Sequence, residues 1–114
     1  MEVSHERFEA LVAEALDLIP YELAEAIDNL AVFVVDQSPE DPELLGLYDG
    51  IPLSDREHYG AMIMPDRISI YRKPICDLCD DEEEVVEQVR ITVIHEVAHH
   101  FGIDDERLEE LGWD

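Results

Sequence analysis

The segment VIHEVAHHFGIDDERLEELGWD, from Val93 to Asp114, decides the fold at the C-terminal end of this chain. From about Asp81 to Phe101 the apolar residues recur with helical periodicity, which predicts one long helix opened by acidic residues. Gly102 is expected to end this helix, because glycine adopts the left-handed conformation of a helix C-terminus without strain. A short last helix is expected over residues 105–111.

The residues before the long helix predict an α+β domain. The expected elements are two helices over about 8–19 and 20–30, a buried strand at Ala31–Val35 and a half-buried strand at Arg67–Arg72. Residues 38–60 are expected to form a loop, because proline and glycine recur there. We therefore expect a single domain over residues 1–114, mostly helical, with a small antiparallel sheet on one side.

Composition limits the classes of function. Seven Lys and Arg residues stand against thirty Asp and Glu residues, so the formal net charge is -23. This charge repels nucleic-acid phosphates and anionic lipid headgroups, and neither kind of partner is expected. No apolar run approaches the roughly 18 residues that span a bilayer, and the N-terminus lacks the pattern of a signal peptide. Two cysteines are too few for a disulfide framework, so a reducing, cytoplasmic location is expected.

His95, Glu96 and His99 form an H-E-x-x-H motif on the long helix. A helix places the two histidines about 40° apart around its axis and about 6 Å apart along it, so both imidazoles can bind one ion. Two imidazoles, a third protein ligand and an open position for water make a catalytic zinc site. Glu96 lies on the same side of the helix and is expected to act as general base towards a zinc-activated water.

The residues after the long helix offer a third zinc ligand. Gly102 and Asp105 lie seven and ten residues after His95. The turn at the glycine can bring an acidic side chain back towards the histidines. Asp105 is the expected ligand on this spacing, and Asp104 is the neighbouring alternative.

This extended motif resembles that of the metzincin clan of metallopeptidases, HExxHxxGxxH, in the variant whose third ligand is aspartate. More closely, the chain resembles the small bacterial zincin-like metallopeptidase family. The resemblance rests on the run H-E-V-A-H-H-F-G-I-D-D and on the segments 46–50 and 65–72. It implies a zincin-like minimal domain with a long active-site helix.

The resemblance also implies site residues and a function. His95, His99 and Asp105 would bind zinc, and Glu96 would be the catalytic base of a zinc-dependent metallopeptidase-like hydrolase. The substrate would be a peptide or protein whose carbonyl is attacked by the activated water. The strand Arg67–Arg72 would form an edge of the cleft and pair with the extended substrate.

The chain departs from larger metzincins after the third ligand. No methionine follows Asp105, and Met62 and Met64 lie upstream, where they are expected to fill the core. No tyrosine or histidine follows the motif either, so the oxyanion is expected to be stabilised by the zinc itself or by an upstream residue. The upstream candidates are Tyr71, Arg72 and His58.

Cys76 and Cys79 offer a competing interpretation. With His95 and His99 they read C-x2-C-x15-H-x3-H, within the spacing range of a closed structural zinc site. The long helix argues against this site, because it would hold the cysteines about 20–25 Å from the histidines. The thiols are instead expected at the surface. The alternative to a peptidase is a zinc-bearing binding or regulatory module that cleaves nothing.

Overall fold

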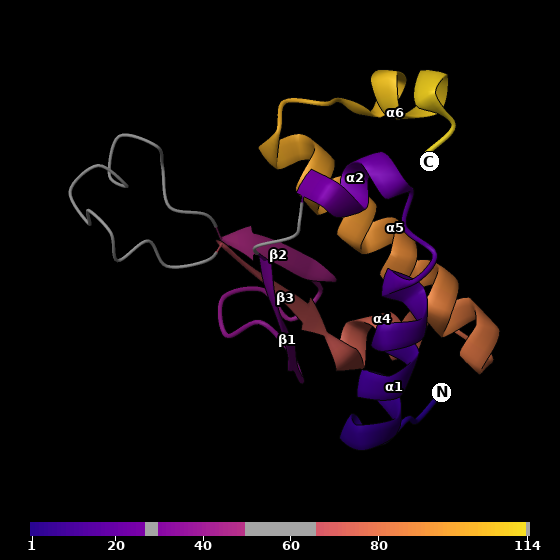
Figure 1. Cartoon of the computed structure of the whole chain (residues 1–114). Helices are drawn as coiled ribbons and strands as arrows, with labels where there is room; N and C mark the ends of the chain where they lie inside the picture. Colours follow the sequence, from indigo (N-terminus) through magenta and orange to yellow (C-terminus); the bar gives the residue numbers. More distant parts are fainter. Residues whose placement is uncertain (27–29, 50–65, 114) are drawn as a thin grey trace.

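The computed structural model describes residues 1–26, 30–49 and 66–113. Five helices and a three-stranded sheet make up this part of the chain (Figure 1), and they confirm the predicted α+β class. The elements are α1 (His5–Leu16), α2 (Tyr21–Ala26), β1 (Leu30–Val35), β2 (Gly46–Asp49), β3 (Asp66–Tyr71), α4 (Arg72–Leu78), α5 (Glu82–His100) and α6 (Asp105–Leu111).

The predicted long helix is α5. Its N-cap residue Asp81 accepts a hydrogen bond from the Glu84 backbone N–H at 2.8 Å, which satisfies one of the unpaired donors at the helix start. The helix ends at His100, and Gly102 has a φ of 78°, the left-handed conformation that was predicted. The short helix α6 covers the predicted residues.

The sheet has the strand order β1-β3-β2. β2 is antiparallel to β3, but β1 is parallel to β3, so the expectation of an antiparallel sheet is wrong for one of the two pairs. The reason is β2, which lies in the stretch predicted to be a loop. After β1 the chain crosses to the far edge, runs back as β2, and then returns as β3 between the two.

β3 is therefore the central strand. It has β1 on one side and β2 on the other, and Arg72 already belongs to α4. The expectation that Arg67–Arg72 forms a free edge for a peptide is wrong, because both sides of this strand are paired within the sheet. The strand at the edge that contacts α5 is β2.

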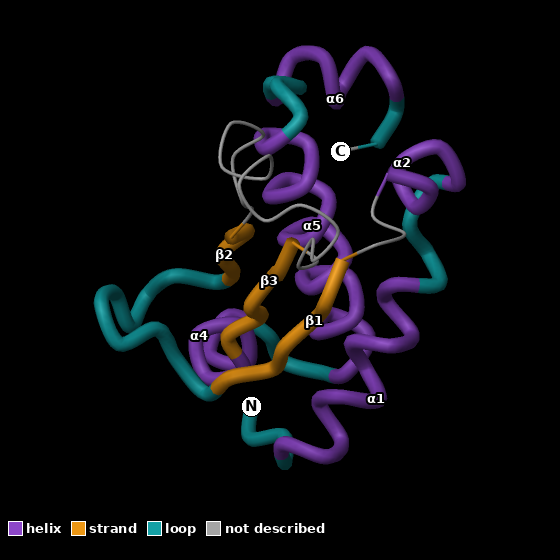
Figure 2. Tube along the Cα trace, turned by 60° about the vertical axis from the view of Figure 1, so that its left-hand side comes forward, coloured by secondary structure: helices purple, strands orange, loops and turns teal. Residues whose placement is uncertain are grey.

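The core lies between the sheet, α5 and α1. α5 packs against β2, and α1 packs against α5, so the helices gather on one side of the strands (Figure 2). Fully buried side chains recur every fourth residue along α5 and come also from α1 and β3: Phe8, Leu11, Ile68, Ile70, Val85, Val89, Val93 and Val97. Burying each of these side chains contributes about 1.5–3 kcal/mol. This stripe fixes the rotation of α5 about its axis and so the direction of its polar side.

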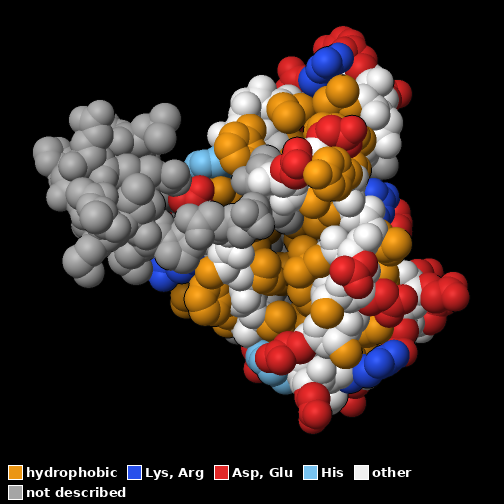
Figure 3. All heavy atoms as spheres, in the orientation of Figure 1, with side chains coloured by type: hydrophobic (Ala, Val, Ile, Leu, Met, Phe, Trp, Pro, Cys, Tyr) orange, Lys and Arg blue, Asp and Glu red, His pale blue; other side chains and the backbone are white. Residues whose placement is uncertain are grey.

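Acidic side chains cover much of the remaining surface. Figure 3 shows them gathered over α6, the start of α5 and the lower end of α1, with few Lys or Arg between them. None of the helices in the described ranges is long and apolar enough to cross a membrane. The surface is therefore strongly negative, as the formal net charge of -23 implies.

Cys76 and Cys79 are buried, with 3% and 4% of their surface exposed, so the prediction of surface thiols is wrong. They lie on α4 and at its C-cap, a helix that the sequence did not indicate. Pro74 sits in the first turn of α4, where proline is tolerated. Burial raises the pKa of both thiols, because a low-dielectric environment disfavours the thiolate.

We expect both thiols to react slowly with iodoacetamide at pH 7 in the folded protein, and rapidly after unfolding in guanidinium chloride. The reason is that the thiolate is the reactive form and burial suppresses it. Mass spectrometry of samples quenched over time measures the rate, with glutathione in the same tube as an exposed reference thiol. Native-state alkylation as fast as that of glutathione would contradict the burial.

Candidate active site

The last two turns of α5 carry His95, Glu96 and His99. Val97 and Ala98 point into the core, while His95 and Glu96 are half-buried and His99 is exposed. The ring centroids of the two histidines lie 5.9 Å apart, with their planes inclined by 31°. Two imidazoles on one tetrahedral zinc ion have centroids roughly 5 Å apart, given bonds of about 2.0–2.1 Å. The separation of the two rings is therefore close to that of two ligands of one ion.

The turn after α5 returns the chain to His99. The backbone reverses at Gly102, and the Ile103 N–H donates to the Ala98 carbonyl at 2.8 Å. As a result Asp105 Oδ1 lies 3.1 Å from His99 Nε2. Two donor atoms on a tetrahedral zinc ion are roughly 3.3 Å apart, so this pair already has nearly the spacing of two ligands.

Asp104 has a different role. It is the N-cap of α6, and its Oδ1 accepts a hydrogen bond from the Arg107 backbone N–H at 2.9 Å. A capping carboxylate stabilises the start of a helix by satisfying one of its free donors. Of the two neighbouring aspartates, Asp104 thus caps α6 and Asp105 faces His99.

Glu96 is held by the sheet. The backbone N–H of Tyr48 in β2 donates to Glu96 Oε2 at 3.2 Å. β2 comes this close to α5 because Gly46 has no side chain: a Cβ at this position would lie 2.7 Å from Thr92 Cγ2. A glycine that was predicted to belong to a loop therefore sets the distance between β2 and the candidate general base.

The side chain of Tyr48 is fixed by two contacts. Its hydroxyl donates to Asp66 Oδ2 at 2.6 Å, and its ring stacks on His100 with centroids 4.0 Å apart. Sequence reasoning assigned no role to Tyr48 or Asp66, because these contacts join three segments that lie far apart in the chain. The one signal was the segment Gly46-Leu47-Tyr48-Asp49-Gly50, which contributed to the family resemblance.

The upstream oxyanion candidates lie elsewhere or outside the described residues. The Arg72 guanidinium donates to Asp36 at 3.0 Å and to a backbone carbonyl near the N-terminus at 2.6 Å. Tyr71 is buried at the opposite end of β3 from Asp66, roughly 17 Å along the strand. The structure therefore supports neither as the oxyanion group. The third candidate, His58, lies outside the described residues, as do Met62 and Met64, which were expected to fill the core.

A cavity of about 320 Å³ opens beside His95 and Glu96. The loop before β2, residues 41–45, forms one wall, and the side chains of Gln88 and Ile91 on α5 belong to the other. Because the candidate zinc ligand His95 and the candidate base Glu96 both line this cavity, part of a substrate can sit next to them.

Within the described ranges, no three His, Cys, Asp or Glu side chains form a ready-made metal-binding group. Two imidazoles and a carboxylate are nevertheless the donor types of a catalytic zinc site. His99 and Asp105 already have nearly the spacing of two ligands, and the His95 ring centroid lies 5.9 Å from that of His99. The chemistry of these donors therefore fits a zinc ion.

The closed zinc site has no such geometry. Cys76 and Cys79 precede the start of α5 at Glu82, and His95 lies about 20 Å further along the helix axis. The helix thus separates the four residues of the C-x2-C-x15-H-x3-H spacing into two groups at its opposite ends.

Comparison with functionally curated proteins gives no match. Among solved structures, the chain is similar to a conserved hypothetical protein from Thermo thermophilus, with a TM-score of 0.56 and 20% sequence identity. The alignment covers 97% of this chain and 100% of that chain, and it shows a shared fold. The family model for zincin-like metallopeptidase matches residues 24–113, which include the sheet, α5 and α6. This chain therefore belongs to the zincin-like metallopeptidase family.

Proposed function

We propose that this protein is a zinc-dependent hydrolase of peptide bonds. The observation that carries the proposal is the 3.1 Å contact between His99 and Asp105, one turn from Glu96 and His95. Membership of the zincin-like metallopeptidase family supports the same reaction class.

In this proposal His95, His99 and Asp105 hold the metal. A zinc ion bound there would act as a Lewis acid, which polarises a carbonyl group and lowers the pKa of a water molecule towards about 7. The fold of the protein contributes by holding the three candidate ligands in position. The two histidines lie on a helix whose other side is buried, and Asp105 is tied to that helix by the turn at Gly102.

Glu96 moves the proton. Its carboxylate takes a proton from the attacking water and later gives one to the leaving amine, a role that contributes about 10²–10⁴-fold to the rate. The hydrogen bond from the Tyr48 N–H to Oε2 orients this carboxylate. Tyr48 is in turn held by Asp66 and His100, so the contacts of Tyr48 position the base.

The outer edge of β2 is the proposed docking strand for the substrate. Leu45 accepts a backbone bond from Tyr71 at 3.0 Å, and backbone groups of an antiparallel strand alternate in direction. Gly46 and Tyr48 therefore face away from β3, consistent with the Tyr48 N–H reaching Glu96. An extended peptide that pairs with the outward backbone groups not bonded to Glu96 would pass beside the base.

A peptide mixture tests the proposed function. We expect the zinc-supplemented protein to cleave members of a proteome-derived peptide library, detected by mass spectrometry. Cleavage should stop with a chelator and return when zinc is restored, because the metal supplies the carbonyl activation. Stoichiometric zinc without any cleavage would refute the hydrolase and favour the alternative, a zinc-bearing binding module.

A further inference from the structure

The cavity beside the candidate active site has walls of two kinds. Leu45 and Ile91 give it an apolar part, and Asp41 and Glu43 contribute two carboxylates from the loop before β2. Glu96 adds a third acidic side chain at the catalytic end. The described residues that line it include no Lys or Arg.

The size of the cavity suits one long side chain. Its volume of about 320 Å³ lies at the lower end of the range for ligand pockets, about 300–1,000 Å³. A lysine or arginine side chain has an alkyl stem for apolar walls and a cationic end for carboxylates. An aspartate or glutamate side chain would meet like charges instead, in a protein whose formal net charge is already -23.

The loop that carries the two carboxylates has hydrogen bonds of its own. Ser38 is buried, and its hydroxyl accepts hydrogen bonds from the Glu40 and Asp41 backbone N–H groups at 3.2 and 3.3 Å. The Glu43 N–H donates to Asp41 Oδ1 at 3.0 Å. These bonds define the local conformation of the loop, which lowers the entropy lost when a ligand binds there.

We propose that this cavity is the specificity pocket of the enzyme and that it selects a lysine or arginine side chain close to the scissile bond. The stem packs against Leu45 and Ile91, and the cation pairs with Asp41 and Glu43. The inference rests on the proposed hydrolase function, because His95 and Glu96 line the same cavity.

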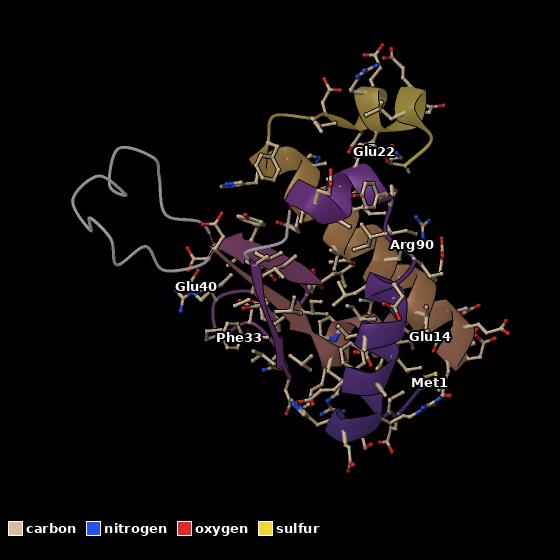
Figure 4. All side chains as sticks on the ribbon, viewed as in Figure 1. Met1, Glu14, Glu22, Phe33, Glu40 and Arg90 are labelled. Carbon is tan, nitrogen blue, oxygen red and sulfur yellow. The ribbon has the colours of Figure 1, made fainter. Side chains whose placement is uncertain are left out.

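The double substitution Asp41→Asn, Glu43→Gln tests the pocket. We expect the ratio of kcat/KM for a lysine-containing peptide to that for its norleucine analogue to fall roughly tenfold, the size of two partly screened ion pairs. The matched control is Glu14→Gln, Glu22→Gln, which removes the same charge from α1 and α2 (Figure 4). If the control lowered the kcat/KM ratio equally, only the net charge of the protein would matter, and the proposed specificity pocket would be refuted.

Binding separates the pocket from the chemistry. Fluorescence anisotropy with labelled lysine and norleucine peptides is measured on the Glu96→Gln protein, which keeps Asp41 and Glu43 and should turn over substrate about 10²–10⁴-fold more slowly. The same measurement is made after Asp41→Asn and Glu43→Gln are added to this protein. If the lysine peptide binds more tightly than the norleucine peptide, and the two added substitutions remove this preference, the specificity pocket is supported even if the parent protein cleaves nothing. Cleavage without any preference for lysine or arginine would overturn the pocket and leave the hydrolase standing.

Discussion

Replacing Glu96 with glutamine should lower kcat for peptide hydrolysis by about 10²–10⁴-fold while zinc stays bound. A glutamine amide has the shape of the glutamate side chain but cannot take a proton from water at neutral pH. Its carbonyl oxygen can still accept the hydrogen bond that the Tyr48 N–H donates to Glu96 Oε2 at 3.2 Å. The contact between α5 and β2 should therefore survive the substitution.

Three measurements on the same preparation decide this prediction. Steady-state kinetics on a cleaved library peptide gives kcat, elemental analysis gives zinc per chain, and thermal unfolding gives Tm. Glu109→Gln on α6 is the matched control, because it makes the same change at an exposed position outside the site. If Glu96→Gln turned over substrate at the parent rate, another group would have to be the base.

Substitutions of the two neighbouring histidines at the end of α5 should have opposite effects on the amount of zinc bound per chain. We expect His99→Ala to lose stoichiometric zinc and His100→Ala to keep it, because the His99 imidazole faces Asp105 whereas the His100 ring stacks on Tyr48. A catalytic zinc site has three protein ligands, so loss of one removes a large part of the binding free energy.

The aspartate pair gives the sharper comparison. Asp105→Asn should weaken zinc binding strongly, while Asp104→Asn should not, since asparagine caps a helix about as well as aspartate and Asp104 caps α6. Cys76→Ala, Cys79→Ala should also keep its zinc. Zinc lost from this cysteine variant and retained in Asp105→Asn would identify the closed site and exclude the catalytic one.

Local signals predict much of this fold. The periodicity of α5, the left-handed Gly102 and the short helix α6 follow from residues within a few positions of each other. The class of the fold follows from the order of such segments. These features depend on backbone preferences and on burial of one side of a helix, and both are written in consecutive residues.

Contacts between distant segments have no such local signal. The glycines around β2 predict a loop, but Gly46 is the residue that lets this strand pack against α5, where any Cβ would come within 2.7 Å of Thr92 Cγ2. The parallel pairing of β1 and β3, and with it the loss of β3 as an edge, follows from this missed strand. The burial of both cysteines likewise depends on α4, a helix with no signal of its own.

By itself the sequence determined that His95, Glu96 and His99 share one side of a helix whose other side is apolar, because helical geometry converts their spacing directly into direction. Only the tertiary structure decided that Asp105 rather than Asp104 faces His99 and that β2 orients Glu96. The physical reason is that these choices depend on hydrogen bonds and close packing between elements, where the partner of each side chain is selected by the whole fold.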